Sequence, residues 1–131
     1  MRFIYNDGGR SKAGYKGNAH DCVVRAFAIA MGVDYKTMYN EIARRNKSVT
    51  GKKSARNGVA HAVSREYLRE HGWVWCKAPQ FSGRKARCCD LPDGMLIAKQ
   101  ANHLVAVADG VPHDTFESSS KMVYGYCKKV A

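Results

Sequence analysis

Three residues that can form a nucleophilic site occur in order along the chain: Cys22, His103 and Asp114. Cys22 opens the run 22–31, which is apolar apart from Arg25 and is followed by a glycine, so a short buried helix is expected there. A thiol is a useful nucleophile only as a thiolate, and a helix N-terminus together with a nearby histidinium lowers its pKa. Cys22 is therefore the candidate nucleophile.

The dipeptide Asp109-Gly110 predicts how His103 and Asp114 meet. Asp-Gly between apolar runs is a strong signal for a two-residue hairpin turn. Such a turn sets Val105 opposite Asp114, and residues two apart on a strand share a face. His103 and Asp114 are then diagonal neighbours about 7–8 Å apart at the backbone, within reach of a side-chain hydrogen bond. In this arrangement Asp114 would fix the imidazole tautomer and stabilise the imidazolium.

Several side chains near Cys22 in the sequence are candidates for assisting its reaction or for positioning it. The Cys22 backbone N–H and an upstream side chain would form an oxyanion site, with Asn18 as the first candidate and His20 as the second. Arg25 shares the helical face of Cys22 and is either a substrate anchor or a plain surface charge. Asp21 is expected to cap the helix, with its carboxylate accepting a backbone N–H.

The segments GNAHDCVVRAFAIAMG and NHLVAVADGVPHDTF resemble the pattern of papain-like cysteine peptidases, in particular the small versions of bacteriophage and bacterial genomes. The order in that superfamily is a Cys on the central helix, a His on a strand, and an Asp or Asn on the next strand. The resemblance implies a papain-like fold, with Cys22 as nucleophile, His103 as general base and acid, and Asp114 as the orienting residue.

The remaining patterns predict an α+β fold over one domain, 1–131, with N-terminal helices packed on a C-terminal antiparallel sheet. Helical spacing predicts helices at 35–45 and 58–72, the former capped by Asp34, and apolar runs predict strands at 73–76, 95–99, 103–108, 111–116 and 121–130. Trp73 and Trp75 are interpreted as core aromatics. Two exposed, mobile loops are expected at 46–57 and 79–94, carrying Lys47, Lys52, Lys53, Arg56, Arg84, Lys85 and Arg87.

Composition limits the partners and the compartment. The net charge of +11 indicates attraction to an acidic protein, an acidic peptide or non-specific nucleic acid, although a solubility role is equally compatible with it. The five cysteines include no CxxC pair, so neither a metal nor a cofactor is expected. No apolar run has the roughly 20 residues needed to span a membrane. A cytoplasmic protein is therefore expected, in the host cytoplasm if a phage encodes it.

Three functions remain open on these patterns. The leading hypothesis is a thiol hydrolase that acts on a peptide or isopeptide bond of a peptide or protein substrate through Cys22, His103 and Asp114. The alternative is a catalytically inactive papain-like binding protein, of the kind a virus could encode, which docks an acidic partner through its basic loops. The third is a nucleic-acid-binding module of purely electrostatic character.

Overall fold

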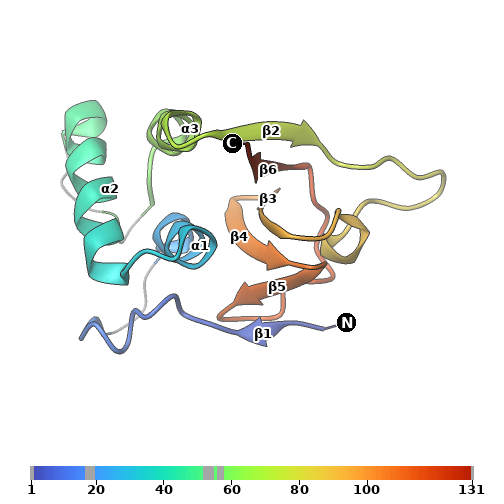
Figure 1. Cartoon of the computed structure of the whole chain (residues 1–131), viewed down its shortest axis with the longest axis horizontal. Helices are drawn as coiled ribbons and strands as arrows, with labels where there is room; N and C mark the ends of the chain where they lie inside the picture. Colours follow the sequence, from blue (N-terminus) through green and yellow to red (C-terminus); the bar gives the residue numbers. More distant parts are fainter. Residues whose placement is uncertain (1, 17–19, 52–54, 56–57, 131) are drawn as a thin grey trace.

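A computed structural model describes residues 2–16, 20–51, 55 and 58–130. Three α-helices lie to one side of a six-stranded sheet (Figure 1). The helices are α1 (Cys22–Met31), α2 (Tyr35–Thr50) and α3 (His61–Glu70), and the strands are β1 (Ile4–Tyr5), β2 (Trp73–Lys77), β3 (Met95–Gln100), β4 (His103–Ala108), β5 (Val111–Asp114) and β6 (Gly125–Lys129). The α+β class predicted from the sequence is confirmed.

Helix α1 begins at Cys22 as predicted and is the central helix. Val24 and Phe27 are fully buried because α1 lies between α2 and strand β4. The helix ends at Gly32, whose φ of 65° is in the left-handed region that glycine adopts without strain. Because α1 is buried on nearly all sides, its packing fixes the position of its first residue, Cys22, beside the sheet.

Helix α2 is longer than the sequence predicts. Asp34 caps it as expected, accepting a hydrogen bond from the Thr37 N–H at 3.2 Å. The helix does not stop at residue 45, however, but runs to Thr50, so the expected loop over 46–57 is wrong in its first part. Asn46 is buried there, and its Oδ1 accepts a hydrogen bond from the Ala60 N–H at 3.1 Å. This contact with the segment before α3 explains why a polar stretch continues the helix.

The strand order is β1-β5-β4-β3-β6-β2. The C-terminal strands β2 to β6 pair antiparallel, as predicted. The N-terminal strand β1, which the sequence analysis did not predict, adds a parallel pairing with β5, so the sheet is mixed. The predicted hairpin is confirmed: Ala108 pairs with Val111, and the turn residues Asp109 and Gly110 have φ of 49° and 79°. Two positive φ values in succession are typical of the tight turn that matches the twist of a hairpin.

The two faces of the sheet contact different apolar groups. One face packs on the helices, in a cluster that includes Phe27, Ile42 and Trp73, and the other carries a cluster that includes Val105 and Val107. Trp73 is a core aromatic as predicted. Trp75, on the same strand, is 58% exposed, so its interpretation as a core residue is wrong.

The segment 79–94, expected to be an exposed basic loop, makes internal contacts. It contains a short 3-10 helix, η1 (Cys88–Asp90), and Arg84 makes two hydrogen bonds to Asp90, at 2.7 and 2.9 Å. Lys52, Lys53 and Arg56 of the other predicted loop lie outside the described residues. Among the described helices, none has the length and apolar character needed to cross a membrane.

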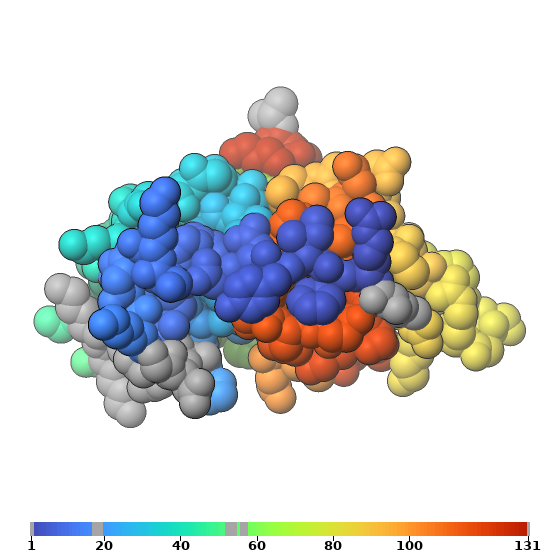
Figure 2. All heavy atoms as spheres, turned by 90° about the horizontal axis from the view of Figure 1, so that it is seen from below, coloured from blue at the N-terminus to red at the C-terminus, as the bar shows by residue number. Residues whose placement is uncertain are grey.

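The N-terminal segment crosses the molecule from sheet to helices (Figure 2). After β1 pairs with β5, the chain passes directly against α1 at Gly8, where an added Cβ would lie 3.3 Å from the Arg25 Cα. Gly8 also has a φ of 71°, so the close approach and the backbone conformation both favour glycine. This passage brings Arg10 to the beginning of α1, where it contacts Asp21.

Candidate active site

Cys22, His103 and Asp114 converge at one end of the sheet. The Nε2 atom of His103 lies 2.6 Å from the Asp114 Oδ2, which confirms the predicted contact across the β4–β5 hairpin. Cys22, half-buried at the first position of α1, interacts with the His103 side chain and the Leu104 backbone. Because Asp114 engages Nε2, Nδ1 is the ring nitrogen that remains for the thiol.

Asp114 is held from several directions. Its Oδ2 also accepts a hydrogen bond from the Ser118 hydroxyl at 2.8 Å, and its Oδ1 accepts one from the Thr115 N–H at 2.8 Å. Arg25 lies 3.5 Å from Oδ1 as an ion-pair partner. Asp114 is 2% exposed, so these contacts replace the water that a carboxylate would otherwise bind. The sequence analysis missed Ser118, whose position depends on how the segment after β5 folds back.

The pKa values of the three groups shift in complementary directions. Burial raises the pKa of Cys22, but interactions with His103 and Leu104 and the positive charges of His103 and Arg25 outweigh it, so the net pKa is lowered. Burial lowers the pKa of His103, yet its interactions with Asp114 and Cys22 raise it overall to about 9. Burial also raises the pKa of Asp114, while His103 lowers it below its usual value. Both shifts favour the form of the pair in which Cys22 is a thiolate and His103 an imidazolium.

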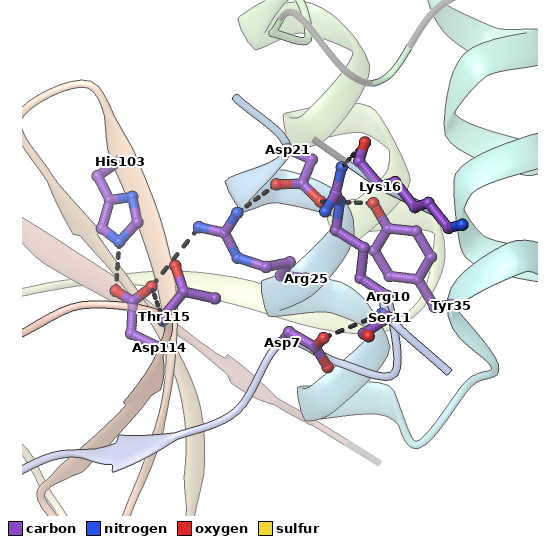
Figure 3. A network of polar contacts seen from close by, with 10 residues as sticks. All are labelled: Asp7, Arg10, Ser11, Lys16, Asp21, Arg25, Tyr35, His103, Asp114 and Thr115. Carbon is purple, nitrogen blue, oxygen red and sulfur yellow. Dashed lines mark hydrogen bonds and ion pairs between the residues drawn. The ribbon is translucent and has the colours of Figure 1, made fainter. Parts of the chain in front are cut away.

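A buried ionic network connects Asp114 to the beginning of α1 (Figure 3). The Asp21 carboxylate is 1% exposed and accepts hydrogen bonds from Arg25 and from the Tyr35 hydroxyl, and Arg10 lies 3.4 Å from it. Asp21 precedes the helix as predicted, but its side chain caps no backbone N–H, so that part of the prediction is wrong. The carboxylate turns inward because two arginines and a buried phenol surround it.

The structure excludes one of the two interpretations that the sequence allowed for Arg25. It is 8% exposed and bridges Asp21 and Asp114, so the surface-charge alternative is wrong. It does contribute to the wall of the cleft at Cys22, and its role as a substrate anchor stays a prediction. His20 is exposed and also lines this cleft. Asn18, the first candidate for the oxyanion site, lies outside the described residues.

The cleft lies between the helices and the sheet. Its volume is about 900 Å³. Cys22 and His103 are on its wall, together with residues of α3 and of strands β2, β3 and β6, and the exposed rings of Trp75 and Phe116. The Phe116 ring centroid lies 5.0 Å from that of His103. A thiolate accessible from a cleft of this size can react with a peptide-sized electrophile.

The other cysteines have different environments. Cys127 lines the same cleft, but burial raises its pKa to about 11, and burial likewise raises the pKa of Cys88 to about 12. Within the described part of the chain, no three His, Cys, Asp or Glu side chains gather in a way that could hold a metal ion. The lowered pKa of Cys22 and its place on the cleft wall favour nucleophilic attack by its thiol.

No protein-family model, no curated protein and no solved structure matches this chain. Function therefore has to be inferred from the geometry of the site.

Proposed function

We propose that this protein is a papain-like thiol hydrolase that cleaves a peptide or isopeptide bond through Cys22, His103 and Asp114. The observation that carries the proposal is the position of His103, which interacts with a half-buried cysteine at a helix N-terminus and with a buried aspartate 2.6 Å away. The lowered pKa of Cys22 and the raised pKa of His103 support it, since packing alone would not require an ion pair there.

In the first half of the reaction, the Cys22 thiolate attacks the carbonyl carbon of the bound substrate. The tetrahedral oxyanion would accept a hydrogen bond from the Cys22 backbone N–H at the positive end of α1, with His20 as the described side chain that can assist. The C–N bond then breaks, and the amine leaves with the proton that His103 carries on Nδ1. The product is a thioester on Cys22.

In the second half, His103 is neutral and accepts a proton from water as that water attacks the thioester carbonyl. The C–S bond breaks, the carboxylic acid leaves, and the Cys22 thiolate is restored beside the imidazolium. Asp114 keeps the ring oriented throughout, because its Oδ2 contacts His103 Nε2 and is fixed in turn by Ser118. No metal or external cofactor enters this balance.

The direct test is to trap the thioester. The protein is mixed with a peptide ester pool and quenched in acid, and intact-protein mass spectrometry and peptide mapping then locate any acyl group. An acyl adduct on Cys22 is expected in the wild type, and none in the Cys22→Ala variant. The Cys127→Ala variant is the matched control, because Cys127 lines the same cleft with a raised pKa and should leave acylation unchanged.

An adduct that persists in Cys22→Ala and disappears in Cys127→Ala would contradict the assignment of the nucleophile. A wild-type protein that forms no adduct with any ester and binds an acidic partner instead would favour the non-catalytic alternative. That alternative gives no reason for the lowered pKa of Cys22, so hydrolysis is the better-supported function.

A further inference from the structure

Besides Arg25, which is paired with Asp21 and Asp114, three Lys and Arg side chains line the cleft around Cys22. Arg65 projects from α3 on the helical wall, and Lys99 of β3 lies on the sheet wall, where it pairs with Leu104, the neighbour of His103. Lys121 has its Nζ 5.0 Å from the Phe116 ring centroid, and that ring contacts His103. The three positive charges therefore surround the reactive pair from opposite walls.

No carboxylate balances these charges within the cleft. The structure describes all 11 Asp and Glu residues of the chain, and none of them lines the cleft. Several other arginines of the chain are paired: Arg45 contacts Glu41 and Glu70, and Arg84 contacts Asp90. Arg65, Lys99 and Lys121 form no ion pair with any of the described residues. Unpaired charges of one sign in a cleft raise the local concentration of ligands of the opposite sign.

We propose that the cleft selects an acidic peptide, whose Asp or Glu side chains flank the bond to be cleaved and are bound by Arg65, Lys99 and Lys121. This inference rests on the proposed function, because it assigns the substrate class of the same site. A peptide fits better than a nucleic acid, since the cations surround a thiolate that reacts with an acyl carbon, which a nucleic acid lacks. The exposed ring of Trp75 adds an apolar contact for the peptide backbone or a neighbouring side chain.

A pair of small alkylating reagents measures the charge effect without requiring turnover. Iodoacetate is an anion and iodoacetamide is neutral, so the ratio of their rates at Cys22 reports the local potential. The test variant is Arg65→Gln/Lys99→Gln/Lys121→Gln. The matched control is Arg69→Gln/Lys85→Gln/Lys128→Gln, which removes the same charge from exposed residues outside the cleft.

At low ionic strength we expect the iodoacetate-to-iodoacetamide ratio to fall about five-fold in the cleft variant and less than about two-fold in the control. Equal ratios in the two variants would overturn the proposal, because the potential at Cys22 would then arise from net charge alone. Circular dichroism melting curves of both variants verify that they remain folded.

Substrate selection is tested with two peptides that carry the same thiol-reactive electrophile and differ only by Glu or Gln at the flanking positions. The Glu peptide should label Cys22 about ten-fold faster than the Gln peptide, and this preference should disappear in the cleft variant but persist in the control. Equal labelling by the two peptides would overturn the proposal. So would protection of Cys22 from iodoacetamide by single-stranded oligonucleotides but not by acidic peptides, which would assign the cleft to nucleic acid.

Failure of the proposed function has a different signature. If Cys22 forms no thioester but the iodoacetate ratio responds as expected, the acidic-ligand site stands and hydrolysis does not. If thioester forms and the ratio does not respond, hydrolysis stands and the acidic specificity does not.

Discussion

Asp114 accepts contacts from His103, Ser118, Thr115 and Arg25, although it is almost fully buried. A carboxylate with this many donors stays ionised, and its charge is a main reason that the pKa of His103 is raised to about 9. The state of Cys22 thus depends on a residue that the thiol itself need not touch.

The Asp114→Asn variant should lower the pKa of His103, because the ring loses its negative partner but keeps a hydrogen-bonding neighbour. With a wild-type pKa of about 9 the ring is almost fully protonated at pH 7, so Cys22 alkylation at neutral pH should slow by about ten-fold if the substitution lowers the His103 pKa to about 6, and by less for a smaller shift. NMR titration of the His103 ring protons measures the shift. Ser118→Ala is the control and should lower the His103 pKa by a smaller amount. An unchanged His103 pKa in Asp114→Asn would contradict the claim that Asp114 raises it.

Arg25 is a second residue whose effect should be large. Removing it leaves Asp21 and Asp114 buried without their shared cation, which typically destabilises a fold by about 3–5 kcal/mol. Urea unfolding of Arg25→Ala should show a loss of this order, and Arg25→Lys should recover part of it. A loss below about 1 kcal/mol would mean that the network of Figure 3 contributes little to the fold.

The sequence predicts the convergence of Cys22, His103 and Asp114, because a helix start and a two-residue turn are local features. It does not predict the roles of Ser118 or of Arg25. These depend on where the segment after β5 folds back and on how α1 approaches β5, which are tertiary contacts. An arginine in an apolar helix is a signal of a buried partner, but the partner can lie anywhere in the chain.

Among the elements, α1 and the β4–β5 hairpin position the chemistry, and β2 with β6 forms a further wall of the cleft. The turn dipeptide predicted the hairpin register correctly. The extension of α2 to Thr50 and the parallel pairing of β1 with β5 were not predictable from local patterns. The first depends on the buried contact of Asn46, and β1 has only two residues, too few for a periodic signal.

Gly125 on β6 offers a test at this scale. An added Cβ would lie 2.2 Å from the Trp75 ring, so Gly125→Ala should displace that ring and destabilise the β2–β6 pair by about 1–3 kcal/mol. Chemical denaturation measures the cost. In a Trp75→Ala background the same substitution should cost less, although the added Cβ would still lie 2.8 Å from the Cys76 carbonyl oxygen. An equal cost in both backgrounds would show that the clash with Trp75 is not its cause.

At the scale of the whole molecule, the distribution of positive charge bears more on where an acidic ligand would bind than the net charge does. The net charge of +11 includes surface cations, the paired arginines and three cleft cations, Arg65, Lys99 and Lys121, that form no ion pair with the residues that the structure describes. The sequence predicted an acidic partner but placed the relevant cations in the loops. Arg84 of those loops is paired with Asp90 and does not line the cleft, whereas the acidic-peptide site that we propose uses residues from α3, β3 and the segment after β5.

Stability as a function of pH follows from the His103–Asp114 pair. His103 has its folded pKa raised above 6.5, so its contribution is fully present below about pH 6.5 and is lost as the pH rises toward 9. Asp114 has its folded pKa lowered below 3.8, so its contribution is present above about pH 4 and is lost in stronger acid. The pair therefore stabilises the fold most between about pH 4 and 6.5.

We expect the free energy of unfolding to decline by about 1–3 kcal/mol between pH 6.5 and 9 in a Cys22→Ser background, in which the thiol no longer titrates. Adding His103→Gln should flatten the curve over this range. Urea denaturation at a series of pH values makes the comparison. A decline that persists undiminished with His103→Gln would assign the pH dependence to other groups.

The most direct test of the central claim is the pH dependence of Cys22 alkylation by iodoacetamide, followed by peptide mapping in the wild type and in His103→Ala. If His103 and Cys22 form an ion pair, the wild-type profile should rise at a pKa below the usual thiol value of 9, and His103→Ala should move it upward. Cys127, whose pKa is raised to about 11, provides the reference thiol within the same cleft and should remain nearly unreactive at neutral pH. A wild-type Cys22 profile centred at or above 9, unchanged in His103→Ala, would contradict the account.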